Sequence, residues 1–328
     1  MRAKFFTILL AAFILAPARA QQAPSVREDQ GPPIRVFVEE VNVQFTVADS
    51  KNHLVTDLNK EDFQVLEEKK SQQITSFSRE SDLPLRIGLM IDTSNSIRDR
   101  FEFEQHASSD FLRALLRPGK DKAFLASFDS IAELVLDFTD DLDKLVPAIQ
   151  SLRPGGGTAL YDAVFGGSRD KMLEEAPPST NTRRAMVVVS DGEDNQSRHS
   201  RQQALEMAER AEVTIYTIST NIRGVKMPGD KILEEFSDQT GGRYFQPYSK
   251  QDLESAFQQI NADLRSQYSL SYHPSNPRDG HYHNIEVVTS RKGLRVRSRR
   301  GYYATSPPGY VPPELAPSGD KPGAPANP

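Results

Sequence analysis

The sequence contains no cysteine, and this absence removes several classes of protein. Without a thiol the chain can form no disulfide framework, no thiolate metal site, no cysteine nucleophile and no lipid anchor on cysteine. The Gly-x-Ser-x-Gly turn of serine hydrolases is also missing, as is the Gly-Lys-Ser/Thr ending of a phosphate-binding loop. The sequence therefore offers no familiar apparatus for nucleophilic catalysis or nucleotide binding.

Acidic residues outnumber basic ones, which gives a formal net charge of −5. A chain of this charge does not fit nucleic acid as its main partner, because the phosphate backbone attracts basic surfaces. The composition, 37% hydrophobic and 26% charged residues, is that of an ordinary globular protein with a real core. The sequence does not fix an oligomeric state.

Long apolar runs are missing except near the N-terminus. Arg2 and Lys4 precede an apolar run at residues 5–15, and Ala-Arg-Ala at 18–20 offers a cleavage site. The run is about half of the ~20 residues that span a bilayer. We therefore predict a signal peptide over residues 1–20 and a secreted or periplasmic protein without a further membrane span. An uncleaved N-terminal anchor is the alternative. An exported chain without cysteine fits a bacterial protein better than an animal one.

Hydrophobic periodicity divides the rest of the chain. Residues 21–34 are polar and proline-containing and read as a linker, and the proline-rich residues 305–328 as a disordered tail. A period of two, typical of strands, occupies 35–82 and returns at 268–304, whereas strands and helices alternate over 83–267. Because strands at both ends of an α/β segment most simply pair with each other, we expect a doubly wound, mostly parallel α/β domain inserted into a small, split, β-sandwich-like domain.

The α/β segment has a regular order of expected elements. Strands are predicted at 85–91, 123–128, 134–138, 185–189 and 213–218, and helices at 104–116, 141–152, 200–211, 230–239 and 250–265. The all-apolar strand 185–189 is typical of the centre of a sheet that is covered on both faces.

Oxygen-bearing side chains follow two of these strands. Asp92, Ser94 and Ser96 alternate just after the first strand, and Asp191 follows the strand 185–189. Thr158 lies in a glycine-rich loop before a helix. Ligands of open α/β sheets bind at the carboxyl ends of strands, so these side chains converge if the two strands are neighbours. Oxygen ligands of this kind suit a hard divalent cation.

These residues resemble the metal-ion-dependent adhesion site (MIDAS) of the von Willebrand factor type A family, with Asp92-x-Ser94-x-Ser96, Thr158 and Asp191-Gly192 in its motif positions. The resemblance covers about residues 83–267. It implies that the hydroxyls of the two serines and the threonine contact Mg²⁺, with Mn²⁺ or Ca²⁺ as alternatives, and that both aspartates bind directly or through water. The cation would then accept an Asp or Glu carboxylate of a protein ligand.

Phe63, the run Gly-Gly-Arg-Tyr-Phe at 241–245 and Arg-Gly-Tyr-Tyr at 300–303 also resemble a bacterial, acidobacterial-type group of secreted proteins with this domain. We therefore expect a secreted bacterial binding or adhesion protein without catalytic residues. One alternative is a periplasmic scaffold or assembly factor in which the metal mainly organises the loops. Another is a metal-dependent hydrolase, for which the motif supplies no obvious general base.

Three further groups have more ordinary interpretations. Glu193 and Asp194 are expected in a solvated acidic loop, with a role around the cation as the alternative. Arg295, Arg297 and Arg299 are expected to form the solvated face of a strand, with contact to an anionic partner as the alternative.

The histidines at 273, 281 and 283 could suggest zinc. We identify no nearby carboxylate or cysteine that would complete such a site, and an exposed hairpin loop is expected instead.

Overall fold

The computed structural model describes residues 40–79, 83–98, 100–176, 182–275 and 279–304. All of these residues belong to one compact unit of the chain. The predicted signal peptide, linker and proline-rich tail lie outside the described residues, so those assignments stay predictions.

A six-stranded sheet forms the α/β region, with the strand order β10-β9-β8-β5-β6-β7. Its strands are β5 (Leu85–Asp92), β6 (Lys122–Phe128), β7 (Ala132–Thr139), β8 (Arg183–Ser190), β9 (Thr214–Ser219) and β10 (Tyr244–Phe245). Neighbouring strands pair in parallel except β7, which runs antiparallel to β6. The sheet confirms the predicted α/β fold with mostly parallel strands.

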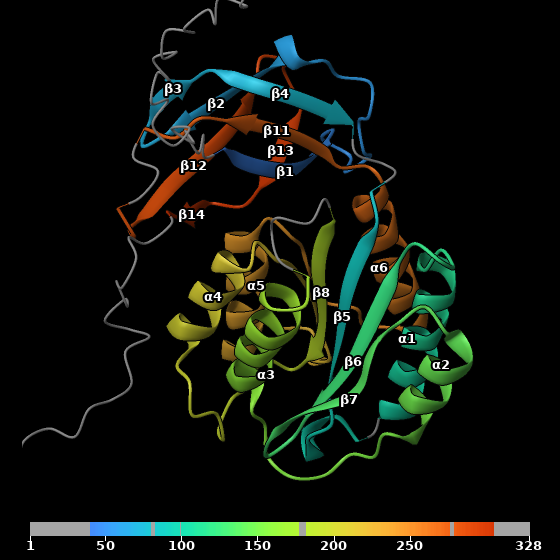
Figure 1. Cartoon of the computed structure of the whole chain (residues 1–328). Helices are drawn as coiled ribbons and strands as arrows, with labels where there is room; N and C mark the ends of the chain where they lie inside the picture. Colours follow the sequence, from blue (N-terminus) through green and yellow to red (C-terminus); the bar gives the residue numbers. More distant parts are fainter. Residues whose placement is uncertain (1–39, 80–82, 99, 177–181, 276–278, 305–328) are drawn as a thin grey trace, which may run out of the picture. The chain divides into compact units, whose positions relative to one another are not determined.

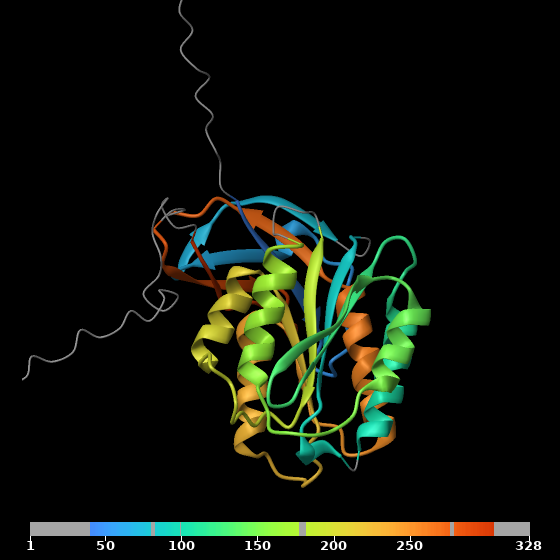
Figure 2. The same cartoon turned by 60° about the horizontal axis from the view of Figure 1, so that its bottom comes forward.

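Helices cover both faces of this sheet (Figures 1 and 2). They are α1 (Phe101–Leu115), α2 (Leu142–Ser151), α3 (Leu160–Gly166), α4 (Arg201–Arg210), α5 (Pro228–Thr240) and α6 (Lys250–Arg265), and α3 continues into the π-helical segment η3 (Gly167–Leu173). One face packs against α1, α2 and α6, and the other against α3, α4 and α5. Helix α1 begins one turn earlier than its apolar pattern predicted.

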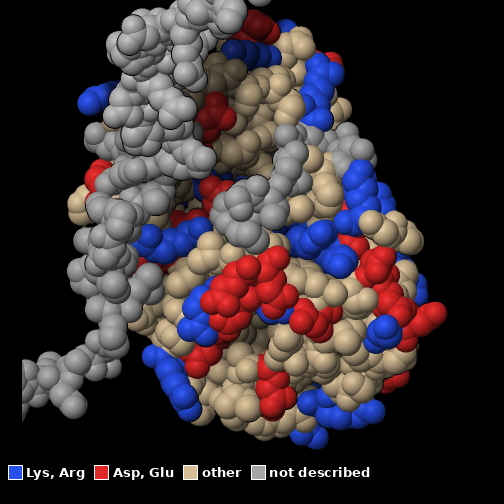
Figure 3. Space-filling view, viewed as in Figure 1, with Lys and Arg blue, Asp and Glu red and all other residues tan. Residues whose placement is uncertain are grey.

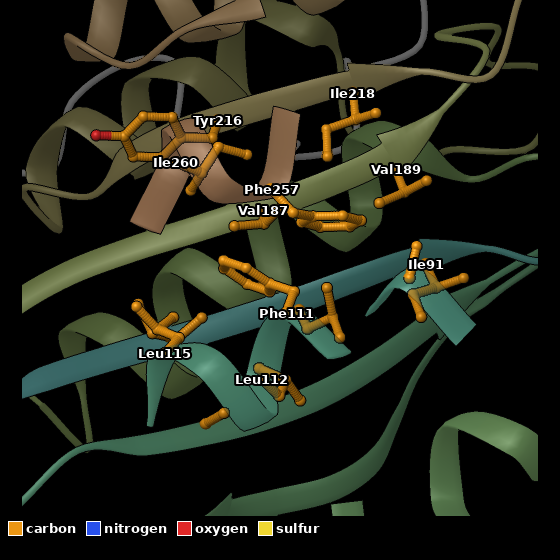
Figure 4. Packing of buried hydrophobic residues seen from close by; sticks show 14 of the residues in the cluster. Ile91, Phe111, Leu112, Leu115, Val187, Val189, Tyr216, Ile218, Phe257 and Ile260 are labelled. Atoms are coloured by element: carbon orange, nitrogen blue, oxygen red, sulfur yellow. The ribbon is translucent and has the colours of Figure 1, made fainter. Parts of the chain in front are cut away.

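The strand β5 shows why the central strands are apolar at every position. Ile87, Leu89 and Ile91 point to the core formed with α1 and α6, whereas Met90 packs on the opposite face against Phe124. Figure 4 shows the first of these cores, in which side chains of α1 and α6 meet those of β5, β8 and β9. Since both faces are covered, neither set of alternate residues can be polar.

Two four-stranded antiparallel sheets contain the remaining strands, in the orders β13-β1-β11-β4 and β14-β12-β2-β3. These strands are β1 (Val41–Ala48), β2 (Phe63–Glu67), β3 (Lys70–Gln72), β4 (Ile74–Arg79), β11 (Tyr268–Tyr272), β12 (Tyr282–Thr289), β13 (Arg295–Ser298) and β14 (Gly301–Tyr303). Strands from before and after the α/β segment pair with each other, as predicted: β1 with β11, and β2 with β12. The exact domain boundaries stay predictions.

Two predictions about exposed residues in this region are wrong. Arg297 Nη1 lies 3.1 Å from Asp263 Oδ2, and Arg299, only 8% exposed, donates to the backbone oxygen of Asn42 at 2.7 Å. These arginines join sheet and helix residues instead of forming a solvated face.

His283 is also buried, not in an exposed loop. It lies 3.0 Å from Asp279 and stacks on Tyr302. No set of three or more metal-ligating His, Cys, Asp or Glu side chains occurs among the described residues.

Candidate functional site

The two strands that end in aspartate are neighbours in the sheet. Strands β5 and β8 pair in parallel, with Leu89 opposite Val187. Asp92 is the last residue of β5, and Asp191 directly follows β8. Both carboxylates therefore lie at the same edge of the sheet, which is the condition that the sequence left open.

The Asp92 carboxylate is fully buried and held in place by two hydrogen bonds. Its Oδ1 accepts the backbone N–H of Ser94 at 2.8 Å, and its Oδ2 accepts the hydroxyl of Ser190 at 2.6 Å. Burial raises the pKa of Asp92 to about 6; the charge of Asp191 also raises it, while the hydrogen bonds act in the opposite direction. Neither aspartate forms an ion pair with any described lysine or arginine. A divalent cation would offset the repulsion between these two carboxylates and stabilise the ionised form of Asp92.

The loop after β5 turns its alternate side chains to one side. The short 3₁₀ segment η2 (Asn95–Ile97) curls the chain, and the hydroxyl oxygens of Ser94 and Ser96 lie 2.9 Å apart. Ser94 is buried and Ser96 is exposed, so the pair reaches from the interior to the surface. The alternate spacing thus has the geometric effect that the sequence predicted.

The glycine-rich loop that carries Thr158 lies directly beside this turn. The backbone N–H of Gly155 donates to the oxygen of Thr93 at 2.6 Å, and Asn95 Nδ2 donates to the oxygen of Gly156 at 3.2 Å. Thr158 itself is buried. These bonds bring the threonine loop next to the Asp92 loop, as the interpretation of a common site requires.

Residues that the sequence interpretation missed connect Thr158 to the Asp191 loop. Asn195 Oδ1 accepts the backbone N–H of Thr158 at 3.0 Å, and the oxygen of Thr158 accepts the backbone N–H groups of Asn195 and Gln196, both at 3.0 Å. The Asp-Asn-x-Ser pattern at 194–197 could have indicated such contacts, because these residue types often form turns and helix caps.

The prediction that Asp194 belongs to a solvated acidic loop is wrong. Asp194 Oδ2 accepts the backbone N–H of Tyr161 at 3.0 Å and the hydroxyl of Ser197 at 2.5 Å. The carboxylate is engaged at the start of α3, just after Thr158. Only Glu193 of the predicted pair is exposed.

The backbone after Asp191 requires a glycine. Gly192 has φ +80°, and a Cβ at this position would lie 2.2 Å from the carbonyl oxygen of Gly229. The first turn of α5 (Pro228–Thr240) therefore packs directly against the Asp191 loop. A side chain here would have to move one of the two segments.

The donor set of this site consists of oxygen atoms only. No hydrogen bond among the described residues uses Thr158 Oγ1 or Asp191 Oδ2, so both can accept a ligand. Two carboxylates and three hydroxyls fit a hard cation such as Mg²⁺. The structure thus brings together the loops that carry Asp92, Ser94, Ser96, Thr158 and Asp191, while their role as metal ligands stays a prediction.

One family model matches part of this chain. Residues 87–193 match the family model of the von Willebrand factor type A domain. The sequence matches none of the curated proteins.

Several solved structures are similar to this chain. A von Willebrand factor type A protein from Catenulispora acidiphila is 12% identical, with 82% of this chain and 74% of that one covered and a TM-score of 0.49. BatB from Bacteroides thetaiotaomicron is 18% identical over 56% of this chain and 100% of its own, with a TM-score of 0.44. Proximal thread matrix protein 1 of the mussel byssus, in a form with zinc in its MIDAS motif, is 15% identical over 61% and 50%, with a TM-score of 0.48. At these identities the likeness concerns the fold alone.

Proposed function

We propose that this chain, which contains a von Willebrand factor type A domain, binds a protein partner by a Mg²⁺-dependent contact to an Asp or Glu carboxylate of that partner. The family commonly mediates metal-dependent protein binding, and most of its members are not catalytic. The observation that carries the proposal is the buried Asp92 carboxylate. It lies near the charge of Asp191 and has no lysine or arginine partner among the described residues.

Each part of the site has a defined task in this proposal. Asp92 and Asp191 would supply the negative charge that holds the cation, and Ser94, Ser96 and Thr158 would supply neutral oxygens. The cation would provide a Lewis-acidic position for the incoming carboxylate. The hydrogen bonds of Ser190 and of the Ser94 backbone fix the orientation of Asp92, so the site is formed before the partner arrives.

Arginines on the surrounding loops support an acidic partner. The loops that follow β5, α2, β8 and β9 each expose an arginine, namely Arg98, Arg153, Arg198 and Arg223. None of them forms an ion pair with another described residue. In a chain of net charge −5, such unpaired positive charges near the site would attract an acidic segment and orient it. Elsewhere, on the face drawn in Figure 3, Lys and Arg lie interspersed with Asp and Glu, which does not favour nucleic acid as the partner.

The proposed setting is the bacterial periplasm or the cell exterior, on the basis of the N-terminal signal pattern. No described helix has the length and apolar character that a membrane crossing needs.

Metal binding is the first test. Isothermal titration calorimetry with MgCl₂ should show binding to the wild type and loss of binding in Asp92→Ala and Asp191→Ala. Glu193→Ala is the matched control, because Glu193 is an exposed acid in the same loop. If Mg²⁺ binds equally well to all four proteins, the site is not where we place it.

Capture of a partner from envelope extracts, with Mg²⁺ or with EDTA, tests the function itself. Capture should require Mg²⁺ and disappear in Asp191→Ala but not in Glu193→Ala. Capture that persists in EDTA while the melting temperature falls would instead support the scaffold in which the metal is structural. Turnover of phosphate or ester substrates that Asp92→Ala abolishes would support a hydrolase.

A further inference from the structure

Helix α1 carries a buried carboxylate without a hydrogen-bond partner. Glu104 is 2% exposed, and neither of its carboxylate oxygens accepts a hydrogen bond from a described residue. Buried polar groups are almost always paired, and buried charges even more so. An acid at this position therefore indicates that a group other than the described residues completes its surroundings.

The predicted metal site lies close enough to act on Glu104. Helix α1 begins five residues after Ser96, and Glu104 lies in its first turn. Burial is the main cause that raises the pKa of Glu104, to about 8, and the negative charges of Asp92 and Asp191 raise it further. Three carboxylates thus influence one another at this edge of the sheet.

Arg100, the basic residue whose charge acts on Glu104, does not neutralise it. Arg100 lies one helical turn before it and lowers its pKa, but Arg100 Nη1 donates to the backbone oxygen of Thr220 at 3.0 Å. No ion pair joins Arg100 to Glu104 in the described structure. Arg100 holds the loop after β9 instead.

The carboxylates of Asp92, Asp191 and Glu104 are not arranged to bind one cation directly. Among the described residues no group of three Asp, Glu, His or Cys side chains is arranged to hold a metal. Ser108, one turn further along α1, is also fully buried with an unpartnered hydroxyl. Glu104 and Ser108 together offer the polar partners that a bound water needs.

We propose that Glu104 is an outer carboxylate of the metal site, which accepts hydrogen bonds from water molecules on the cation that Asp92 and Asp191 hold. The inference rests on the metal site of the proposed function. Water on a divalent cation is a strong hydrogen-bond donor, and outer carboxylates that receive such bonds strengthen metal binding. Glu104 is thus a positioning residue that acts through water.

Titration of the purified protein with MgCl₂ in a calorimeter tests the inference. Glu104→Gln keeps the shape of the side chain but replaces one accepting oxygen with an amide NH₂ group, and it should weaken Mg²⁺ binding about tenfold or more. Glu102→Gln is the matched control, because Glu102 lies on the exposed side of the same helix. Its affinity should stay within about twofold of the wild type, since an exposed charge is well screened.

A second measurement distinguishes this role from a purely structural one. Protein-bound Mn²⁺ speeds the relaxation of solvent protons through the water that it carries, and Glu104→Gln should change this effect at saturating Mn²⁺. Glu102→Gln should not.

Each outcome has a definite meaning. Wild-type Mg²⁺ affinity in a folded Glu104→Gln protein would overturn the inference and leave the proposed function intact. Absence of Mg²⁺ binding to the wild type would overturn both. If Glu104→Gln does not fold, Glu104→Asp replaces it, since the shorter carboxylate should bind Mg²⁺ more weakly than wild type; equal affinity would again overturn the inference.

Discussion

Asn195 Oδ1 accepts the backbone N–H of Thr158 at 3.0 Å and thereby joins the loop after β8 to the glycine-rich loop before α3. Thr158 comes from one loop and Asp191 from the other, so this contact fixes the distance between two predicted ligands. We expect this contact to affect the affinity for a cation more than the stability of the fold, because contacts behind the metal ligands orient those ligands.

Asn195→Ala should therefore weaken Mg²⁺ binding about tenfold while the protein stays folded. Gln196→Ala is the control, since Gln196 contacts the oxygen of Thr158 through its backbone N–H, which the substitution keeps. Calorimetric titration with MgCl₂ measures both. Equal affinities of the two variants would show that the Asn195 side chain does not position Thr158.

Gly192→Ala should damage the site through the backbone. Gly192 and Gly119 both have positive φ, +80° and +73°, but a Cβ on Gly119 meets nothing within 4 Å, whereas one on Gly192 would lie 2.2 Å from Gly229 O. Gly119→Ala should cost about 1–2 kcal/mol for the left-handed conformation alone. Gly192→Ala should cost about 1–3 kcal/mol more for the collision.

Urea unfolding in EDTA compares these two alanine variants without any contribution from bound metal. The Gly192 variant should also bind Mg²⁺ more weakly, because the strained residue follows Asp191. Equal losses of stability in the two variants would contradict this prediction. They would mean that the segments around Gly192 and Gly229 can move apart and avoid the collision at little cost.

The positions of Asp92 and Asp191 could be predicted because their signals are local. An apolar run of strand length predicts a strand, and a carboxylate directly after it must emerge at the edge of the sheet. The pairing of β5 with β8 was the remaining condition, which the sequence left open and the structure supplies. Local patterns therefore placed each carboxylate at a strand end but did not bring the two together.

The roles of Asp194, Asn195 and Arg299 could not be predicted in the same way. Each depends on a partner more than 30 residues away: Tyr161, Thr158 and Asn42. From the sequence, a polar or charged residue in a loop or near an edge strand is predicted to be exposed to solvent. The local pattern of hydrophobic residues does not reveal which distant segment will contact it. The contacts of these side chains are decided by packing between segments.

Arg299 should be important for stability, in contrast to Arg295. Arg299 is buried and reaches both the backbone oxygen of Asn42, at 2.7 Å, and Glu212 Oε1, at 3.3 Å. Removing one partner of a buried charged network leaves the other unpaired, so Arg299→Ala should cost about 3–5 kcal/mol in the free energy of unfolding.

Arg295→Ala is the matched control, because Arg295 lies in β13, which directly precedes Arg299, and its side chain is exposed. It should change stability by less than about 0.5 kcal/mol. Urea titrations followed by circular dichroism measure both. Similar losses for the two arginines would contradict the interpretation of Arg299 as a buried link.

Glu209 should make the stability of the protein depend on pH independently of any metal. It is a buried residue of α4, and burial raises its pKa to about 7, although the Tyr282 hydroxyl and Arg299 act in the opposite direction. An unfolded chain releases this proton near pH 4.5. Between these two values the folded protein holds a proton that the unfolded chain has lost, so the contribution of Glu209 to the free energy of unfolding falls as pH rises, by at most about 1.4 kcal/mol per pH unit. Above pH 7 the loss is complete.

Glu209→Gln removes this titration. The variant should therefore gain stability relative to the wild type as pH rises from 5 to 7.5, and the difference should level off above that range. Urea unfolding at pH 5, 6 and 7.5 in EDTA measures it, and comparison at each pH cancels the other groups that titrate in both proteins. Glu254→Gln, an exposed substitution on α6, should follow the wild-type curve. A constant difference between Glu209→Gln and wild type across this range would show that Glu209 is already charged in the folded protein at pH 5.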